Sequence, residues 1–234
     1  MGRWVLACLL ALIPVASFAQ SFLAGLVAFD RGDYPTALAH WIPLSEQGDA
    51  SAQSNLGILY DEGLGVAVDR VEAVRLYRLS AEQGIAMAQN NLGIMYSAGF
   101  GVEHDAIEAV RWYRRAAEQG HPGAQNNLGR MYQFGFGIDL DYTEAERWYR
   151  LAAEQGFPDA LRNLGLIYLN GTGLPRDLVS AFMWASLSVE QGNILAAGDN
   201  EFLQQLMSAD EIAEALERAS NCRAWDYHQC FDPA

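Results

Sequence analysis

The sequence predicts an all-α protein, specifically a right-handed α/α superhelical solenoid of helix-turn-helix repeats. Three observations predict it: a 36-residue period, helical spacing of apolar residues within each period, and glycines where the helices should end. Glu-Gln-Gly begins at positions 46, 82, 118, 154 and 190, always 36 residues apart. A fixed period of this length is typical of stacked repeats. The complete units are 49–84, 85–120, 121–156 and 157–192.

The first half of each unit predicts a helix that packs inward. In the first unit Ala52, Leu56 and Tyr60 are spaced so that they share one helix face. The helix should end at Gly63, because glycine adopts the left-handed conformation that closes a helix without a steric penalty. The same residue types recur 36, 72 and 108 positions later.

The second half of each unit predicts a second helix. The motif Asp69-x-x-Glu72, repeated at Asp105 and Asp141, places an N-cap side chain and an acid at the positive end of the helix dipole. Alanines and Trp-Tyr pairs follow at helical spacing. A single helix pair cannot bury its apolar face, so neighbouring units are expected to stack.

The chain ends depart from the repeat as capping elements would. Residues 20–48 read as a shorter N-terminal helix pair that resembles a tetratricopeptide repeat, and residues 193–234 as C-terminal capping helices. Within the latter, Ser208-x-x-Glu211 is a capping box that predicts a last helix running to about Ser220.

Residues 1–19 have the pattern of a cleavable secretory signal peptide. One basic residue, Arg3, precedes an uncharged apolar run, and Ser17-Phe18-Ala19 supplies small residues for cleavage near Ala19. The run is short for a membrane span, so no stable membrane insertion is expected after cleavage. The alternative is lipidation at Cys8. The prediction is a periplasmic or secreted protein.

Two cysteines remain after such a cleavage, Cys222 and Cys230. In an oxidising compartment they are best explained by a disulfide that holds the C-terminal segment. The alternative is a metal site that would add His228 and Asp226 or Asp232, although this spacing matches no standard zinc pattern.

The net charge of −14 excludes some partner classes. All fifteen basic residues are arginine, and most recur on helices that also carry Asp or Glu, so they form no basic patch. A surface of this sign repels nucleic acid and anionic membranes.

The recurring motif resembles the Sel-one-like repeat. The match lies in Ala-Gln-x-Asn-Leu-Gly-x-x-Tyr, Gly-x-Gly-Val and Asp-x-x-Glu-Ala-x-Arg-Trp-Tyr-Arg-x-Ala-Ala-Glu-Gln-Gly, over residues 49–192. The resemblance implies a right-handed α/α superhelix. It also implies a role as an adaptor, because most members of this family are adaptors, among them periplasmic regulators of sensor kinases and envelope or host-contact proteins.

The resemblance also leaves a second function open. Cysteine-rich members bind or slowly hydrolyse β-lactams, and they carry a cysteine pair in each repeat. This sequence has no cysteine between residues 9 and 221. A cell-wall or β-lactam-directed hydrolase or binding protein is therefore the alternative to a scaffold.

The candidate binding surface is a stripe of variable positions on the first helices, expected on the concave face. Variation is informative because packing dictates the repeated framework, whereas an exposed face can specialise. The stripe comprises Ser54, Ile58, Asp61, Asn90, Ile94, Ser97, Asn126, Arg130, Gln133, Arg162, Leu166 and Leu169. The invariant Asn55, Asn91, Asn127 and Asn163 are interpreted instead as structural amides that bond to a neighbouring turn.

No catalytic, metal or cofactor motif is found. His40, His104, His121 and His228 fall in different units without paired spacing. We therefore expect a non-enzymatic adaptor, possessing no cofactor, that binds a protein or peptide partner in the periplasm or outside the cell.

Overall fold

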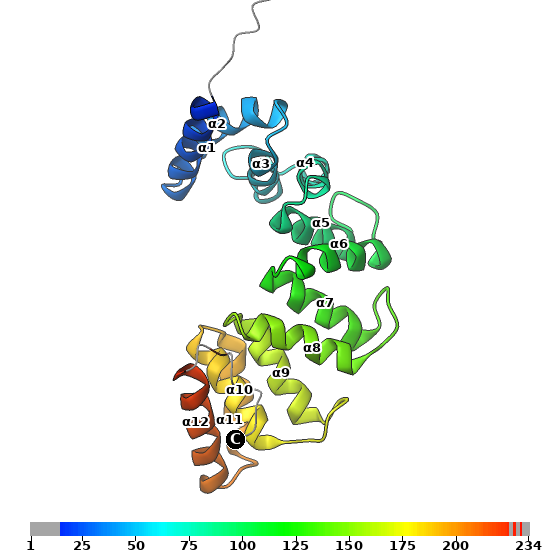
Figure 1. Ribbon diagram of the computed structural model, residues 1–234, viewed down its shortest axis with the longest axis vertical. Helices are drawn as coiled ribbons and strands as arrows, with labels where there is room; N and C mark the ends of the chain where they lie inside the picture. Colours follow the sequence, from blue (N-terminus) through cyan, green and yellow to red (C-terminus); the bar gives the residue numbers. More distant parts are fainter. Residues whose placement is uncertain (1–14, 225–226, 228–229, 231–234) are drawn as a thin grey trace, which may run out of the picture. The chain divides into compact units, whose positions relative to one another are not determined.

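The computed structural model describes residues 15–224, Tyr227 and Cys230, with only the backbone described for residues 15–19. Within this part of the chain all regular structure is helical (Figure 1). The helices are α1 Val15–Asp30, α2 Tyr34–Glu46, α3 Ala50–Glu62, α4 Arg70–Glu82, α5 Ala86–Ala98, α6 Ala106–Glu118, α7 Pro122–Phe134, α8 Tyr142–Ala153, α9 Pro158–Asn170, α10 Leu178–Glu190, α11 Ile194–Gln204 and α12 Ala209–Ala224. The predicted all-α repeat fold is confirmed.

The chain divides into two compact units, residues 1–80 and 81–234, and the division falls within α4. In the N-terminal unit α1 packs on α2 and α2 on α3. Its core is centred on Trp41, which is 1% exposed and whose Nε1 donates to the carbonyl of Phe22 at 3.3 Å. A side chain at Gly25 would collide with the Trp41 ring, so this glycine permits the α1–α2 contact.

In the C-terminal unit each helix packs on the next from α5 to α11, and α12 packs on α10. Its buried residues form two clusters. One lies around Tyr113 and Leu128, the other around Tyr149 and Trp184. Tyr132 packs against both clusters and so links them.

The helix ends lie where the glycine and aspartate motifs predict. Gly99, Gly135 and Gly171 end α5, α7 and α9 in the left-handed conformation. The Asp105 carboxylate then caps α6 by accepting from the backbone N–H of Glu108 at 3.0 Å. The backbone N–H of Asp105 bonds to the carbonyl of Tyr96, which fixes the loop between the two helices of the repeat.

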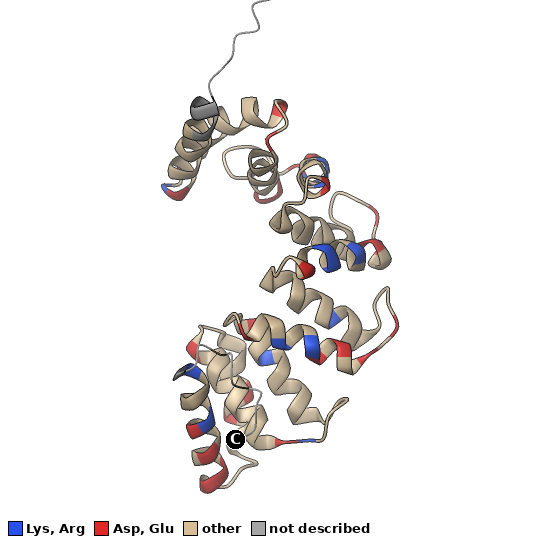
Figure 2. Ribbon diagram, in the orientation of Figure 1, with Lys and Arg blue, Asp and Glu red and all other residues tan. Residues whose placement is uncertain are grey.

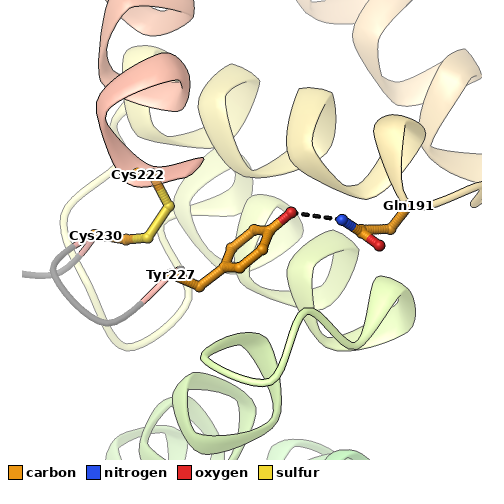
Figure 3. The surroundings of a disulfide bond; sticks show 4 residues. All are labelled: Gln191, Cys222, Tyr227 and Cys230. Carbon is orange, nitrogen blue, oxygen red and sulfur yellow. Dashed lines mark hydrogen bonds between the residues drawn. A yellow bond between two sulfur atoms is a disulfide. The ribbon is translucent and has the colours of Figure 1, made fainter. Parts of the chain in front are cut away.

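The C-terminal cap matches its predicted features and extends further. Glu211 accepts from the backbone N–H and the hydroxyl of Ser208, both at 2.8 Å, as a capping box requires. The helix runs to Ala224, past the predicted end. Cys222 and Cys230 form the predicted disulfide (Figure 3). Tyr227, between them, accepts a hydrogen bond from Nε2 of Gln191 at 2.6 Å, which attaches this segment to the end of α10 (Figure 3).

Some predictions lie outside the described residues. Cys8 and most of the predicted signal peptide precede residue 15, and Asp226, His228 and Asp232 of the alternative metal site are not described either. The described residues contain no helix long and apolar enough to span a bilayer. They also contain no group of three or more His, Cys, Asp or Glu that could hold a metal ion.

Candidate functional site

The repeat framework of the C-terminal unit is held together by a series of side-chain amides. Nδ2 of Asn127 donates to Oδ1 of Asn90 at 3.1 Å, and Nδ2 of Asn163 to Oδ1 of Asn126 at 2.8 Å. Each bond joins the first helices of consecutive repeats. Asn127 and Asn163 are therefore structural, as predicted, but the partner of each is another asparagine and not a turn.

This amide series corrects one part of the predicted stripe. Ser54, Asn90 and Asn126 were expected on an exposed surface, yet all three are buried. For Asn90 and Asn126 the expectation was wrong because their helices also contact the first helix of the adjacent repeat, through the asparagine hydrogen bonds. The Ser54 hydroxyl is buried without a hydrogen-bond partner in the described structure.

Other stripe positions have intramolecular partners. Arg162 is bound to Asp199 of α11 through two hydrogen bonds of 2.6 and 3.3 Å. Gln133 accepts from the Tyr149 hydroxyl at 2.6 Å, and Asp61 accepts from Arg70 at 3.3 Å. Leu169 packs against the core around Trp184. These residues are committed to the fold, which leaves fewer side chains for a partner.

The remaining positions are Ile58, Ile94, Ser97, Arg130 and Leu166. Ile58 and Leu166 are half-buried, and Ile94 is exposed. Ser97 and Arg130 come together: both line a pocket of about 370 Å³ between the second and third repeats.

The pocket is built from α5 to α7 and the loops between and after them. Its walls are Ser97, His104, Ala106, Tyr113, Asn127, Arg130, Met131, Phe134, Gly135, Phe136 and Gly137. Polar and apolar groups therefore meet in one concave site, which is the usual composition of a ligand pocket.

Tyr113 provides a rigid polar wall. The side chain is 4% exposed and its hydroxyl is hydrogen-bonded to Ser97. Burial raises the pKa of Tyr113 to about 12, against the opposing effects of Ser97 and the positive charge of Arg130. The hydroxyl therefore stays protonated at neutral pH and can donate a hydrogen bond.

Arg130 provides the positive charge of the pocket. It is the only charged residue of α7, it is exposed, and it has no ion pair in the described part of the chain. Its charge also opposes the burial that raises the pKa of Tyr149. The guanidinium therefore acts electrostatically on two tyrosines and forms no ion pair with a described carboxylate.

Phe134 and Phe136 form the apolar wall. They are 53% and 57% exposed, and their rings stack with centroids 5.7 Å apart. The glycine between them, Gly135, turns the chain so that the two rings come together.

Sequence reasoning missed Tyr113, His104, Phe134 and Phe136 as pocket residues. Tyr113 belongs to the repeated framework, so it carried no distinguishing signal. Phe134 and Phe136 did carry one, because the equivalent residues of the next repeat are Asn170 and Thr172.

The repeat model matches residues 50–85, 86–121, 122–157 and 158–193, described as Sel1 repeat. These segments begin one residue after the units defined by the internal period. No curated protein matches the chain.

Several solved structures resemble it. The Sel1 repeat protein from Oxalobacter formigenes is 33% identical, with a TM-score of 0.75 over 86% of this chain and 82% of that one. A protective antigen of uropathogenic Escherichia coli is 32% identical, with a TM-score of 0.73 over 92% of this chain but only 49% of that one. An immunity protein of Pseudomonas aeruginosa shares the fold at 17% identity, with a TM-score of 0.55 over 87% of this chain and 83% of that one. The chain belongs to the Sel1 repeat family.

Proposed function

We propose that this protein is a non-catalytic scaffold outside the cytoplasm that binds a partner protein at the pocket between its second and third repeats. Sel1 repeat proteins generally serve as protein-interaction scaffolds and are typically not enzymes. The location rests on the signal-like segment 1–19 and on the disulfide between Cys222 and Cys230, which fits an oxidising compartment.

The observation that carries the proposal is the unpaired Arg130 beside two exposed phenylalanines. Most other arginines with acidic neighbours pair with them, as Arg111 does with Glu108 and Arg147 with Glu144. Figure 2 shows acidic segments at the start of α6 and α8, with basic segments further along the same helices. An exposed cation and an aromatic pair at one pocket form a surface that the fold itself does not use, and Arg and aromatic residues are enriched at protein interfaces.

Site-specific photocrosslinking in the native cell envelope tests the proposal. A photoreactive amino acid replaces Phe134, and a control replaces Ile107, which is 57% exposed on the second helix of the repeat and does not line the pocket. We expect a discrete protein adduct from position 134 and none from position 107. Equal adducts at both positions, or none at either, would contradict the proposal.

Fractionation of the same cells tests the location. The mature protein is expected in the periplasm or the medium, with a mass lower than that of the full chain by the weight of residues 1–19. A full-length protein in the cytoplasm would refute export and leave the crosslinking result to stand by itself.

A further inference from the structure

The pocket exists because two of its wall residues are smaller than their counterparts in the next repeat. Ser97 corresponds to Gln133, and Ala106 corresponds to Tyr142. In the next repeat Gln133 reaches the Tyr149 hydroxyl, whereas Ser97 binds the equivalent Tyr113 with a much shorter side chain. The same framework thus carries larger side chains at these two positions of the next junction, where Tyr142 lies against Gly173.

Arg130 is the second departure from the repeat. The equivalent positions of the other three repeats hold Ile58, Ile94 and Leu166. Those residues build the same helix without a charge, so packing does not require an arginine. The cation thus stands at a junction that holds a pocket.

The groups around the cation define what it can bind. A guanidinium has a donor geometry that matches a carboxylate in two parallel hydrogen bonds. The Tyr113 hydroxyl and the Asn127 amide lie in the same pocket and can contribute further hydrogen bonds. The rings of Phe134 and Phe136 offer an apolar surface within the same site.

The surrounding charge limits the ligand to a small negative charge. Glu103, Asp105, Asp139 and Asp141 lie on the two loops next to the pocket, and the whole chain has a net charge of −14. A phosphate dianion or a nucleic acid would meet one cation and several acids. A single carboxylate next to an apolar group matches one arginine and two phenyl rings.

We propose that the pocket binds an acidic side chain of a partner polypeptide together with an adjacent aromatic or aliphatic side chain. Arg130 pairs with the carboxylate, and Phe134 and Phe136 contact the apolar side chain. This inference rests on the proposed function, since it assigns the chemistry that the scaffold recognises.

Selection of random peptides tests it. The peptides are displayed inside a coat protein loop, so that no free chain end supplies a carboxylate. Selection on the wild-type protein is expected to enrich Asp or Glu within two positions of Phe, Tyr, Trp, Leu or Ile. Selection on Arg130→Gln should lose the acidic preference, and selection on Arg176→Gln, an exposed arginine in the loop after α9 and outside the pocket, should keep it.

A pocket-filling variant provides a second readout. Ser97→Gln introduces the residue that the chain itself uses at position 133, so the variant is expected to fold. A selected peptide with blocked ends should bind the Ser97→Gln variant at least about tenfold more weakly than it binds the wild-type protein. Replacement of the peptide's acidic residue by its amide should weaken binding to the wild-type protein by a similar factor, but should not weaken binding to Arg130→Gln. Circular dichroism and thermal unfolding of each variant confirm that it is folded.

The outcomes separate the two proposals. Enriched peptides without an acid, an unchanged preference in Arg130→Gln, no enrichment at all, or full binding by Ser97→Gln would overturn the carboxylate assignment. If a crosslinked partner is still found at position 134, the scaffold function survives that result. If neither peptides nor crosslinks are found, both proposals fail.

Discussion

Asn163 and Asn126 lie 37 residues apart in sequence, and their side-chain amides meet at 2.8 Å between the first helices of consecutive repeats. Asn126 is 5% exposed, so its acceptor oxygen has little access to water. The bond therefore fixes the spacing of two repeats through a group that would be costly to leave unpaired.

Replacing Asn163 by Ala should lower the free energy of unfolding by about 1–3 kcal/mol, because the buried Asn126 oxygen loses its donor. Urea unfolding monitored by circular dichroism measures the change. Asn170→Ala, at an exposed position of the same helix, is the control and should change stability by less than about 0.5 kcal/mol. Equal losses in both variants would show that the amide bond contributes nothing.

Substitutions at Gly137 and Gly120 distinguish the cost of backbone strain from the cost of a steric collision. Both have a positive φ, +68° and +87°, but a Cβ at Gly137 would lie 2.4 Å from the backbone of Ala106, whereas Gly120 has nothing within 4 Å. Gly120→Ala should cost about 1–2 kcal/mol from the left-handed conformation alone. Gly137→Ala should cost clearly more in the same unfolding assay, and an equal or smaller cost would contradict the close approach of the loop to α6.

Arg162 and Arg130 should differ in their effect on stability. Arg162 is half-buried and donates two hydrogen bonds to the Asp199 carboxylate, so Arg162→Ala leaves a partly buried carboxylate without its cation. We expect Arg162→Ala to lower the free energy of unfolding by about 1–3 kcal/mol and Arg130→Ala to change it by less than about 0.5 kcal/mol. Thermal unfolding of the two variants side by side checks this, and the reverse order would mean that Arg130 is structural.

His121 should make stability depend on pH. Its Nδ1 caps α7 by accepting from the backbone N–H of Ala124 at 3.1 Å, which only the unprotonated nitrogen can do. Burial lowers the pKa of His121 below its ordinary value of 6.5. At pH values between the lowered pKa of His121 in the folded protein and its ordinary pKa in the unfolded chain, the unfolded chain binds more protons. The contribution of His121 to the free energy of unfolding is therefore complete above pH 6.5 and is lost as the pH falls through the lowered pKa.

The substitution His121→Asn tests this, because Asn caps helices but does not titrate in this range. As the pH falls from about 7.5 to about 5, the unfolding free energy of wild type should decrease relative to that of the variant. The other three histidines are common to both proteins and cancel. A difference that is constant with pH would mean that His121 does not cap the helix in solution.

The disulfide should stabilise the C-terminal segment. The bond between Cys222 and Cys230 closes a short loop, for which chain entropy predicts a contribution of about 2–3 kcal/mol. The double variant Cys222→Ser, Cys230→Ser should lose about this amount in urea unfolding. Reductant should lower the stability of wild type toward that of the variant and leave the variant unchanged. If reductant also lowered the stability of the double variant, the effect of reductant would not come from the Cys222–Cys230 bond.

The sequence predicted the helices well because the signals for their ends are local. Gly135 ends α7 and Asp141 caps α8 through groups within a few residues, so a recurring pattern is enough to locate them. The capping box of Ser208 and Glu211 is equally local.

The binding surface was harder to predict because burial depends on what packs against a helix. Asn126 varies between repeats as a surface position would, yet it is buried by contact with Asn163. Arg162 likewise looked available, but it is bound by Asp199, which takes the place of the repeated asparagine 36 residues after Asn163, where the Asn-Leu-Gly motif is lost. The pocket depends on the small side chains of Ser97 and Ala106. The pattern within a single repeat does not predict a cavity that forms between two repeats.

The most direct test of the account is the yield of the crosslinked adduct at position 134 when Arg130 is changed to Glu. We expect the adduct to disappear in Arg130→Glu and to persist in Arg176→Glu. Both variants should unfold at the same temperature as the wild-type protein. An adduct of undiminished yield in Arg130→Glu would contradict the claim that this arginine, left unpaired by the fold, holds the partner.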